Sequence, residues 1–333
     1  MKSSFRVARL LVVVGLAAIP IVLSGQAGPA GQGGRGAPAP ITPLGPDAPF
    51  TVAVATAVVE AAPVYMAKEG PFGSQFEYIN GGVRTVAARG AHAAGNATTQ
   101  MLVVLRDNPN VRLLFTLVEG LYRIVAKRSA GIKTLADLKG KRIVVPRSTS
   151  AHYHLVAMLR SAGLQESDVT LVSAPATGMA AALARGEADA ISMWEPESQN
   201  AVEAIGKDAV IFQNNKIYRE FYSVYSTTDV MNDPKRRAQL VAFVRAIKTT
   251  TDTLKKDPKP FFPLISRVTK HPADQIERGW EHHAFPFDVP SDLLDILVEE
   301  EKYVAAMQKR APRPRAELQG YIDTSILKEA LGR

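Results

Sequence analysis

The sequence predicts an α/β fold of two lobes, each built on a parallel sheet with flanking helices. Short β-prone runs alternate with helical stretches from residue 50 to residue 193, an order typical of parallel strands joined by helical crossovers. The 333 residues also exceed the usual size of one compact domain. The segment Ala88-Arg89-Gly90 recurs as Ala184-Arg185-Gly186 after 96 residues, which favours two similar lobes.

The first part of this alternation is defined by apolar and β-branched runs separated by turn residues and alanine-rich stretches. The expected strands are 50–54, 75–79, 111–117 and 121–126, and the expected helices are 64–69 and 83–89. Gly90 follows the second helix and is its expected stop, because glycine readily adopts the left-handed conformation that ends many helices. Strand, helix, strand, helix is therefore the predicted order of the N-terminal region.

The second part repeats the same unit. Thr134 followed three residues later by Asp137 is an N-cap pattern, and Gly140 is the expected end of that helix. Further strands are expected at 143–145, 169–172 and 188–193, with helices at 150–161 and 177–185 between them.

The last third is predicted to be helical after one strand at 222–226. Pro234 follows Asp233 and suits the first position of a helix. Two apolar faces are expected, on this helix and on one that opens at Ser291. They comprise Leu240, Val244, Ile247, Thr251 and Leu254 on the first helix, and Leu294, Leu297, Val298, Val304 and Met307 on the second. Both helices are expected to pack on the first lobe.

The N-terminus resembles a secretory signal. Lys2, Arg6 and Arg9 precede a 14-residue apolar run that contains Pro20, and small residues follow as far as residue 27. The run is short for a membrane span, so cleavage near residue 27 is predicted, with an uncleaved signal-anchor as the alternative. Residues 28–49 are rich in Gly, Pro and Ala and are expected to form a flexible leader.

Composition excludes several classes of function. Loss of the three basic residues of the signal lowers the net charge from +8 to +5, too mild a balance for a nucleic-acid partner. The chain contains no cysteine, which excludes disulfides, zinc-thiolate sites and a lipid-modified N-terminal cysteine. A soluble periplasmic protein without metal or cofactor is expected.

Candidate ligand-binding residues follow the ends of predicted strands, where open α/β sheets bind their ligands. Ser148, Thr149, Ser150 and His152 surround the start of the helix at 150–161. A helix N-terminus with free N–H groups and hydroxyls suits an oxyanion, although Ser and Thr also serve as simple caps. The polar stretch 95–99 occupies the equivalent place in the first lobe, and residues 58–61 form the loop after the first strand.

Trp194 and Glu195 follow the strand at 188–193. Trp194 either stacks on a planar ligand or closes the rim of its lobe. Glu195 and Glu60 could both bind an amine, and a bare anion would be disfavoured if both carboxylates line the cleft. Catalytic patterns are weak: His282 and His283 are adjacent, and the pair His152 and His154 does not share one helical face. Capping or solvated histidines are the preferred interpretation.

The chain resembles the periplasmic solute-binding proteins of ABC importers, in the nitrate, sulfonate and taurine class that also includes binders of thiamine-pyrimidine precursors. The matching segments are 131–141 (Gly-Ile-Lys-Thr-Leu-Ala-Asp-Leu-Lys-Gly-Lys), 186–190 (Gly-Glu-Ala-Asp-Ala), 194–196 (Trp-Glu-Pro) and 321–323 (Tyr-Ile-Asp). The resemblance implies the type II periplasmic-binding-protein fold, with two crossings near 119–121 and 219–222. It assigns residues 50–119 and 222–333 to lobe I, and residues 120–221 to lobe II.

The resemblance also implies which residues contact the ligand. They are Val58, Val59, Glu60 and Ala61; Asn96, Ala97 and Thr98; Ser148, Thr149, Ser150 and His152; Trp194 and Glu195; and Phe221, Tyr222 and Ser223. His92-Ala93 stands where family members often carry Gly-x-x-Asp, so the identity of the ligand is the least transferable feature.

The predicted function is non-enzymatic: a monomer that binds a sulfonate-like anion or a pyrimidine- or amine-type compound and delivers it to a permease and an ATPase in the inner membrane. One alternative is a periplasmic sensor or accessory domain that uses the same cleft. Another is an enzyme resembling a fungal pyrimidine synthase of this fold, which carries a cysteine-rich motif that a chain without cysteine cannot have.

Overall fold

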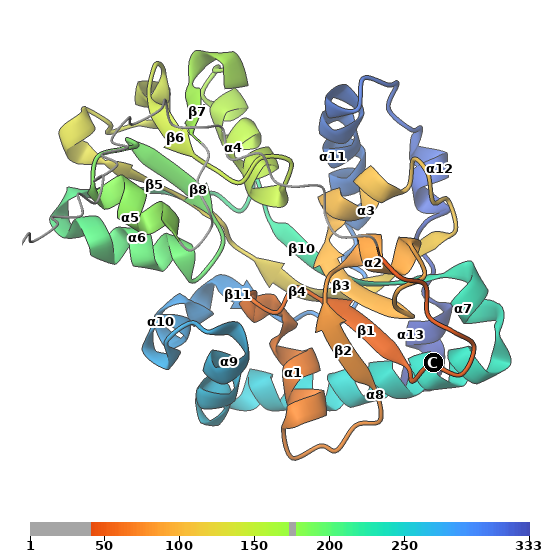
Figure 1. Cartoon of the computed structure of the whole chain (residues 1–333). Coiled ribbons are helices and arrows are strands. Elements are labelled where there is room, and N and C mark those ends of the chain that lie inside the picture. Colours follow the sequence, from red (N-terminus) through yellow and green to blue (C-terminus); the bar gives the residue numbers. More distant parts are fainter. Residues whose placement is uncertain (1–40, 173–177) are drawn as a thin grey trace, which may run out of the picture. The chain divides into compact units, whose positions relative to one another are not determined.

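The computed structural model describes residues 41–172 and 178–333 (Figure 1). Residues 41–333 form one compact unit. The predicted signal segment and the first part of the predicted leader, residues 28–40, lie outside the described residues, as does the expected start of a helix at residue 177. Within the described part of the chain, no helix is both long and apolar enough to span a bilayer.

The first of two sheets, sheet A, has six strands in the order β11-β4-β10-β3-β1-β2. The strands β2, β1 and β3 are parallel, whereas β10 is antiparallel to both β3 and β4, and β11 is antiparallel to β4. The bounds are β1 Thr51–Val54, β2 Glu77–Asn80, β3 Ala93–Ala97, β4 Val111–Gly120, β10 Glu220–Thr227 and β11 His283–Ala284.

Sheet B has five strands in the order β7-β6-β8-β5-β9. The strands β7, β6 and β8 are parallel, and β5 is antiparallel to β8 and β9. The bounds are β5 Arg123–Lys127, β6 Arg142–Val144, β7 Thr170–Val172, β8 Ala190–Met193 and β9 Ala209–Phe212. The predicted two-lobed α/β fold is confirmed, and each sheet contains three mutually parallel strands. The first strand after each crossing, β5 in sheet B and β10 in sheet A, runs antiparallel to them.

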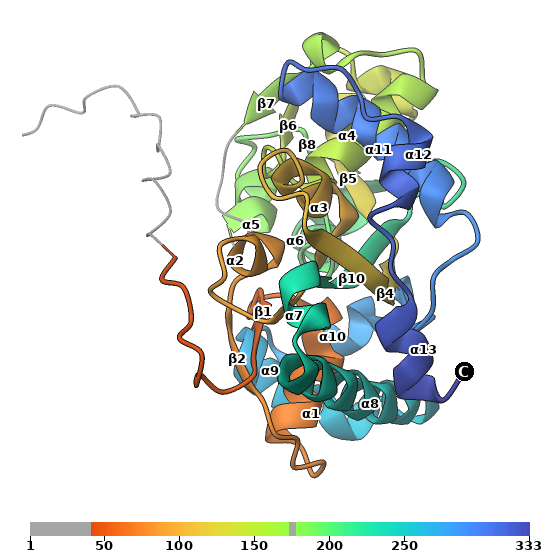
Figure 2. The ribbon, with the colours of Figure 1, turned by 90° about the vertical axis from the view of Figure 1, so that its right-hand side faces the viewer.

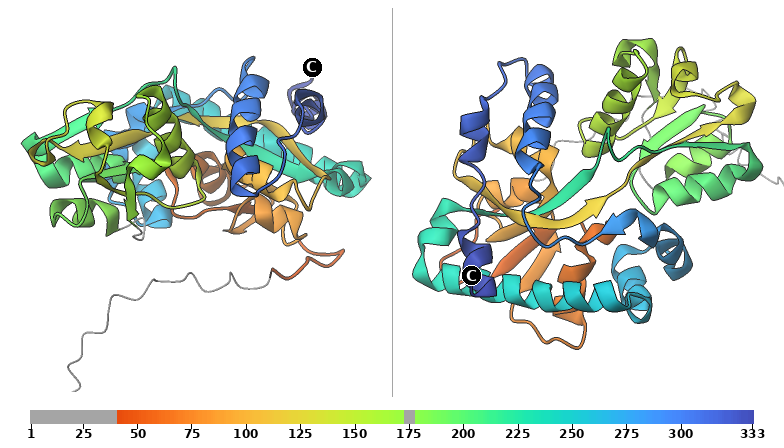
Figure 3. Two further views of the ribbon diagram at one scale, coloured as in Figure 1. Left: turned by 90° about the horizontal axis from the view of Figure 1, so that it is seen from above. Right: turned by 180° about the vertical axis from the view of Figure 1, so that it is seen from behind.

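Two crossings connect the sheets. The chain leaves sheet A at the end of β4 and enters sheet B with β5 after residues 121–122. It returns through residues 213–219, between β9 and β10. The long strands β4 and β10 are adjacent in sheet A, and Figure 3 (right) shows both running toward the second sheet. The first crossing lies beside its predicted position. The second lies earlier than expected, because β10 already begins at Glu220.

Helices cover both sheets. They are α1 Ala62–Glu69, α2 Val83–Ala87, α3 Thr98–Val104, α4 Ser150–Ser161, α5 Met179–Ala184, α6 Glu197–Ile205, α7 Thr228–Asn232, α8 Pro234–Lys256, α9 Phe262–Thr269, α10 Ala273–Gly279, α11 Leu293–Met307, α12 Arg315–Gln319 and α13 Ser325–Leu331. The helix expected after Thr134 is a short 3-10 turn, Leu135–Leu138. Asp137 holds its start, because Oδ2 accepts the N–H of Thr134 at 2.8 Å.

The long helix α8 begins as the sequence predicts. The Asp233 carboxylate accepts the N–H of Arg236 at 2.8 Å and caps the helix ahead of Pro234. All five residues of its expected apolar face are buried. The helix packs against α1 and α13, as the rotated view in Figure 2 shows.

The buried face of α11 differs from the expected one. Leu297 and Val304 are buried and Leu294 and Val298 are half-buried, but Met307 is exposed. The buried stripe instead includes two carboxylates with partners in the interior. Glu300 accepts a hydrogen bond from the Thr98 hydroxyl at 3.0 Å, and Glu301 accepts the N–H of Arg313 at 2.8 Å.

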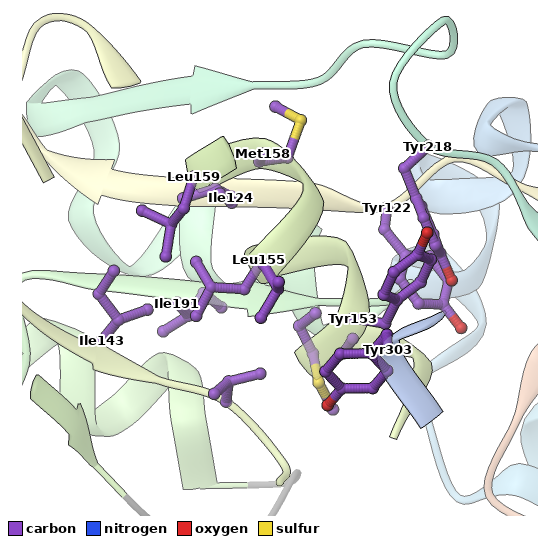
Figure 4. Close-up of a cluster of buried hydrophobic side chains, with 14 of the residues drawn as sticks. Tyr122, Ile124, Ile143, Tyr153, Leu155, Met158, Leu159, Ile191, Tyr218 and Tyr303 are labelled. Atoms are coloured by element: carbon purple, nitrogen blue, oxygen red, sulfur yellow. The ribbon is translucent and has the colours of Figure 1, made fainter. Parts of the chain in front are cut away.

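A continuous core lies between sheet B and α4 (Figure 4). Ile143 of β6 and Ile191 of β8 face Leu155 and Leu159 of the helix. Four tyrosines extend this cluster toward sheet A, and two of them stand on the two crossings. They are Tyr122, Tyr153, Tyr218 and Tyr303. A second core packs α1 and α8 against sheet A.

Residues 41–49, the described end of the predicted leader, contain neither strand nor helix but contact the folded chain. The Leu44 N–H donates to the Arg89 carbonyl at 2.9 Å. The Arg236 guanidinium of α8 donates to the carbonyls of Pro46 and Ala48 at 2.5 and 2.9 Å. Arg236 therefore joins the start of α8 to the segment that precedes β1.

Candidate functional site

A cavity of about 220 Å³ lies where the carboxyl ends of the parallel strands of both sheets meet. Its lining combines residues that follow β1, β3, β6 and β8 with one residue from a crossing and one from β10. The lining residues are Ala55, Val58, Glu60, Gly95, Asn96, Ala97, Gln100, Tyr122, Thr149, Ser150, Trp194 and Tyr222. This is where α/β folds of this kind bind ligands.

Two larger hollows lie elsewhere on the chain. One of about 620 Å³ adjoins the second crossing and includes Glu119, Arg219 and Asp292. Another, of about 780 Å³, includes Arg147, Arg160 and exposed Met307. Neither is lined by residues at the carboxyl ends of the parallel strands of both sheets, as the smaller cavity is. We therefore take the smaller cavity as the candidate site.

Glu60 supplies the carboxyl group of the cavity wall. It stands in the 3-10 turn Val59–Ala61 that follows β1, and only 3% of it is exposed. Its Oε2 atom has no hydrogen-bond partner in the part of the chain that the structure describes. Burial raises the pKa of Glu60 to about 8; its own backbone N–H opposes the shift, and the charges of Glu220 and Glu195 add to it. At neutral pH the group is therefore mostly a protonated acid.

Tyr222 forms the adjoining surface. It pairs with Ala97 across β10 and β3, and its buried hydroxyl has no partner among the described residues. A methyl group on Gly95 would lie 2.6 Å from the Tyr222 ring, so only glycine lets the ring lie over β3 at this point. The Asn96 side-chain oxygen accepts the N–H of Ala97 at 2.8 Å, which fixes the amide at the end of β3.

The opposite wall is the start of α4. Ser150 is the first residue of this 12-residue helix, and its hydroxyl lies 3.1 Å from that of Tyr122. The Thr149 hydroxyl donates to the Pro146 carbonyl at 2.6 Å and so does not cap the helix. The N–H groups of the first turn carry partial positive charge and favour an acceptor atom of a ligand.

Two aromatic rings complete the site. Trp194 follows β8 and is half-buried, and its ring centroid lies 6.1 Å from that of Tyr122, with the ring planes at 50°. Tyr122 stands on the first crossing. The two rings offer an organic molecule an apolar surface at the junction of the two sheets.

Seven of the predicted ligand-binding residues line this cavity: Glu60, Asn96, Ala97, Thr149, Ser150, Trp194 and Tyr222. Val58, from the range implied by the resemblance, joins them. Val59 and Ala61 flank Glu60 but are buried in the core of sheet A. The expected contacts Phe221 and Ser223 also fall outside the lining; the Ser223 hydroxyl instead pairs with that of Thr116 at 3.2 Å.

Two other expected residues are bound to partners in the protein. Thr98 donates to Glu300, as described above. Glu195 accepts the Nε–H of Arg123 at 2.7 Å in a pair that is almost fully buried. Burial raises the pKa of Glu195 to about 7 even though Arg123 lowers it. Of the two carboxylates considered for binding an amine, Glu60 lines the cavity and Glu195 does not.

Ser148 and His152 lie on the far side of the turn that opens α4. His152 Nδ1 accepts the Ser148 N–H at 3.2 Å and lies 2.9 Å from the Tyr303 hydroxyl of α11. Both residues line the hollow of about 780 Å³ rather than the candidate site. His152 thus contacts the helices beside sheet A and leaves Ser150 to face the cavity.

Sequence reasoning missed three lining residues: Ala55, Gln100 and Tyr122. Ala55 directly follows β1, so the rule that ligands bind after strand ends could have included it. Tyr122 adjoins the predicted first crossing, where an aromatic residue could have been suspected. Gln100 gave no local signal; its side chain lies at the cavity because it donates to the Ser148 carbonyl at 3.1 Å.

The donor groups of the site suit an organic ligand better than a metal. No cluster of three or more His, Cys, Asp or Glu residues able to hold a metal ion occurs within residues 41–172 and 178–333.

Comparison with known proteins gives two kinds of likeness. The family described as NMT1/THI5 like matches residues 80–260, more than half of the chain. The taurine-binding periplasmic protein of Escherichia coli K12 is 35% identical over 80 residues, which are 24% of this chain and 24% of that relative's own length. The chain thus spans about a quarter of this relative in the matched stretch.

Solved structures show the fold. The periplasmic aliphatic sulphonate binding protein SsuA from Escherichia coli superposes with a TM-score of 0.68 at 13% identity, over 85% of this chain and 98% of that one. The desulfurization enzyme DSZB superposes with a TM-score of 0.61 at 16% identity, over 85% and 99% of the two chains. The described chain therefore has the two-sheet periplasmic-binding-protein fold, which both a binding protein and an enzyme adopt.

Proposed function

Because the chain belongs to the NMT1/THI5-like family, we propose that it is the periplasmic solute-binding component of an ABC importer. In this role it binds a small organic solute, either a sulfonate-like anion or a pyrimidine- or amine-type compound, and delivers it to a permease and an ATPase in the inner membrane. It acts as a monomer that reaches the periplasm by means of the predicted signal at residues 1–27.

The observation that carries this proposal is a cavity built by both sheets. Glu60 and Tyr222 face it from sheet A, and Ser150 and Trp194 face it from the side of sheet B. A solute held there touches both halves of the fold, so its binding energy favours the arrangement in which the halves meet. The cavity volume of about 220 Å³ suits a small molecule rather than a peptide.

The lining residues support a binding role without catalysis. They include no histidine, lysine or cysteine, side chains that often act as nucleophiles or activate them. The nearby histidines of α4 are engaged elsewhere: His152 contacts Tyr303, and His154 Nδ1 lies 2.8 Å from the Ser192 hydroxyl. The fold likeness to DSZB leaves an enzyme as the alternative candidate, and turnover of a bound solute would distinguish it.

A thermal-shift screen of the purified chain tests the proposal. Sulfonates, nitrate, taurine and pyrimidines are added separately, and a solute that binds the folded state raises the melting temperature by mass action, by an amount that grows with its concentration. We expect at least one of these classes to raise it, and Trp194→Ala to reduce that rise. A flat response to every class would contradict the solute-binding function.

A further inference from the structure

We propose that Glu60 makes this site selective for organic amines, because its carboxyl group accepts N–H groups of the bound solute. This inference rests on the proposed solute-binding function and narrows it to one substrate class. It predicts that the amine, rather than the sulfonate or another oxyanion, is the group that the site requires.

Glu60 is held in position before any ligand arrives. The Tyr65 hydroxyl of α1 lies 2.8 Å from the Ala55 carbonyl and 3.0 Å from the Val58 carbonyl, and so fixes the loop between β1 and the turn that carries Glu60. The carboxyl lines the cavity, and its Oε2 atom is buried without a partner within the described chain. A buried acceptor without a partner in the cavity wall is the feature that a solute must match.

An unpaired buried carboxyl oxygen is costly, and a solute recovers that cost only by donating a hydrogen bond. An ammonium group donates up to three and adds a favourable charge interaction. A sulfonate or nitrate offers only acceptor oxygens: it can accept the single O–H of the protonated carboxyl, but it is repelled by the ionised carboxylate and leaves its oxygens unpaired. Glu60 therefore discriminates between the two classes when it is ionised, as it is when paired with an ammonium ion.

The groups that face Glu60 make a positive ligand more favourable still. Glu220 of β10 and Glu195 after β8 add negative charge at Glu60, and Tyr65, Tyr122 and Tyr222 contribute hydroxyl groups nearby. Glu220 also has one buried oxygen without a partner in the described chain. The neighbouring guanidinium of Arg123 is committed to Glu195 at 2.7 Å and to Gln199 at 3.0 Å. The solute is thus the natural source of the balancing cation.

The other walls accommodate the rest of such a solute. The rings of Trp194 and Tyr122 face its organic body, and aromatic faces attract cations as well. Across the cavity, the first turn of α4 suits an acceptor group at the far end of the molecule. An amine that also carries an oxyanion would engage both walls.

Amine binding has a proton balance that can be measured. Unliganded Glu60 holds its proton at neutral pH, since its pKa is about 8. When an ammonium ion binds, the carboxyl ionises to pair with it, and one proton leaves to the solvent. Affinity for an ammonium ligand should therefore rise with pH until unliganded Glu60 is itself ionised near pH 8.

Matched pairs of probes test the inference by calorimetry on the purified chain. Taurine and ethanesulfonate differ only in the amine of taurine. Benzyl alcohol carries a hydroxyl group where benzylamine carries its amine. We expect the amine of at least one pair to bind about tenfold or more tightly than its partner, consistent with about 1.5–3 kcal/mol for a hydrogen bond to a charged group. Its affinity should rise between pH 6 and pH 8, with release of a proton.

Two variants assign the effect to Glu60. Glu60→Gln keeps the size of the side chain but cannot ionise, so amine affinity should fall about tenfold and its pH dependence should flatten. Glu197→Gln is the matched control, because Glu197 is a buried glutamate outside the cavity lining. Glu197→Gln should change amine affinity by less than about twofold relative to the unmodified chain, because the change lies away from the site. Circular dichroism and the melting temperature confirm that both variants fold.

The outcomes separate this inference from the function on which it rests. If neither amine binds more tightly than its partner, or if Glu60→Gln leaves amine affinity unchanged, selectivity for amines is overturned while solute binding stands. If amines bind without proton release and without pH dependence, the pairing with Glu60 is overturned. If neither these probes nor the wider panel bind, both proposals fail together.

Discussion

Trp194 is the side chain whose role the sequence left most evenly divided, between stacking on a ligand and closing the rim of the fold. The structure places it on the cavity beside Tyr122. We predict that Trp194→Ala weakens binding of benzylamine about tenfold, because aromatic and cation–π contacts contribute about 0.5–2 kcal/mol beyond the buried area. Calorimetry measures the change. Trp280→Phe is the control, since Trp280 packs on Phe262 and Phe285 outside the site; equal affinities for both variants would remove the stacking role.

Glu195 and Arg123 form a buried ion pair, with side chains only 2% and 5% exposed. We predict that Glu195→Ala lowers the free energy of unfolding by about 3–5 kcal/mol, because a buried guanidinium loses its partner. Glu195→Gln should cost less, since the amide oxygen still accepts a hydrogen bond. Urea unfolding of the three proteins measures the difference. A loss below about 1 kcal/mol for Glu195→Ala, typical of exposed pairs, would contradict the structural role given to this pair.

At the residue scale, the sequence could predict those site residues whose position follows from a strand end. Glu60, Ser150 and Trp194 all come shortly after a parallel strand, so they reach the cavity by topology alone. Glu195 and His152 have equally suggestive positions, but their orientation depends on distant partners. Arg123 draws Glu195 away from the cavity, and Tyr303 of α11 contacts His152. No local sequence pattern predicts contacts between residues so far apart in the chain.

Among the elements, α8 follows the sequence most closely, and its stability depends on one apolar face. We predict that Ile247→Ala lowers the free energy of unfolding by about 2–5 kcal/mol, because Ile247 is fully buried and its removal leaves a cavity. Lys255→Ala, on an exposed position of the same helix, should change it by less than about 0.5 kcal/mol. Chemical denaturation compares the two, and similar losses would show that α8 is not anchored by this face.

The strand β3 and the direction of β10 could not be predicted from the sequence. β3 has the sequence Ala-Ala-Gly-Asn-Ala, which contains no β-branched or aromatic residue and therefore predicts no strand. It is a strand because β1 and β10 lie on either side of it and satisfy its backbone. The antiparallel direction of β10 likewise follows from its return across the crossing from sheet B. The β-propensity of the residues indicates neither the strand β3 nor the direction of β10.

For the whole molecule, buried titratable groups predict how stability depends on pH. Burial raises the pKa values of Glu60, Glu195 and Glu220 to about 8, 7 and 7, so the folded chain holds protons that the unfolded chain has lost above about pH 4.5. Burial also lowers the pKa values of His92 and His154 to about 4 and 3, which opposes this effect only below about pH 6.5.

Between about pH 6.5 and pH 8 the buried carboxyl groups of the described residues therefore dominate the difference in protonation between the folded and unfolded states. Since the folded state binds more protons than the unfolded state in this window, we predict that the free energy of unfolding falls as pH rises through it. Urea unfolding at several pH values measures the slope, and Glu60→Gln should make it shallower. Stability that is flat or rising across this window, or a slope unaffected by Glu60→Gln, would contradict the assignment of buried protonated carboxyls.

In the proposed function, both sheets hold one solute in the cavity between their strand ends. The most direct test is a crystal structure of the chain with the solute that most raises its melting temperature. We predict that the bound solute contacts Glu60 or Tyr222 on one wall of the cavity and Trp194 or Ser150 on the other. A solute bound to one wall alone, or in either of the two larger hollows, would contradict it.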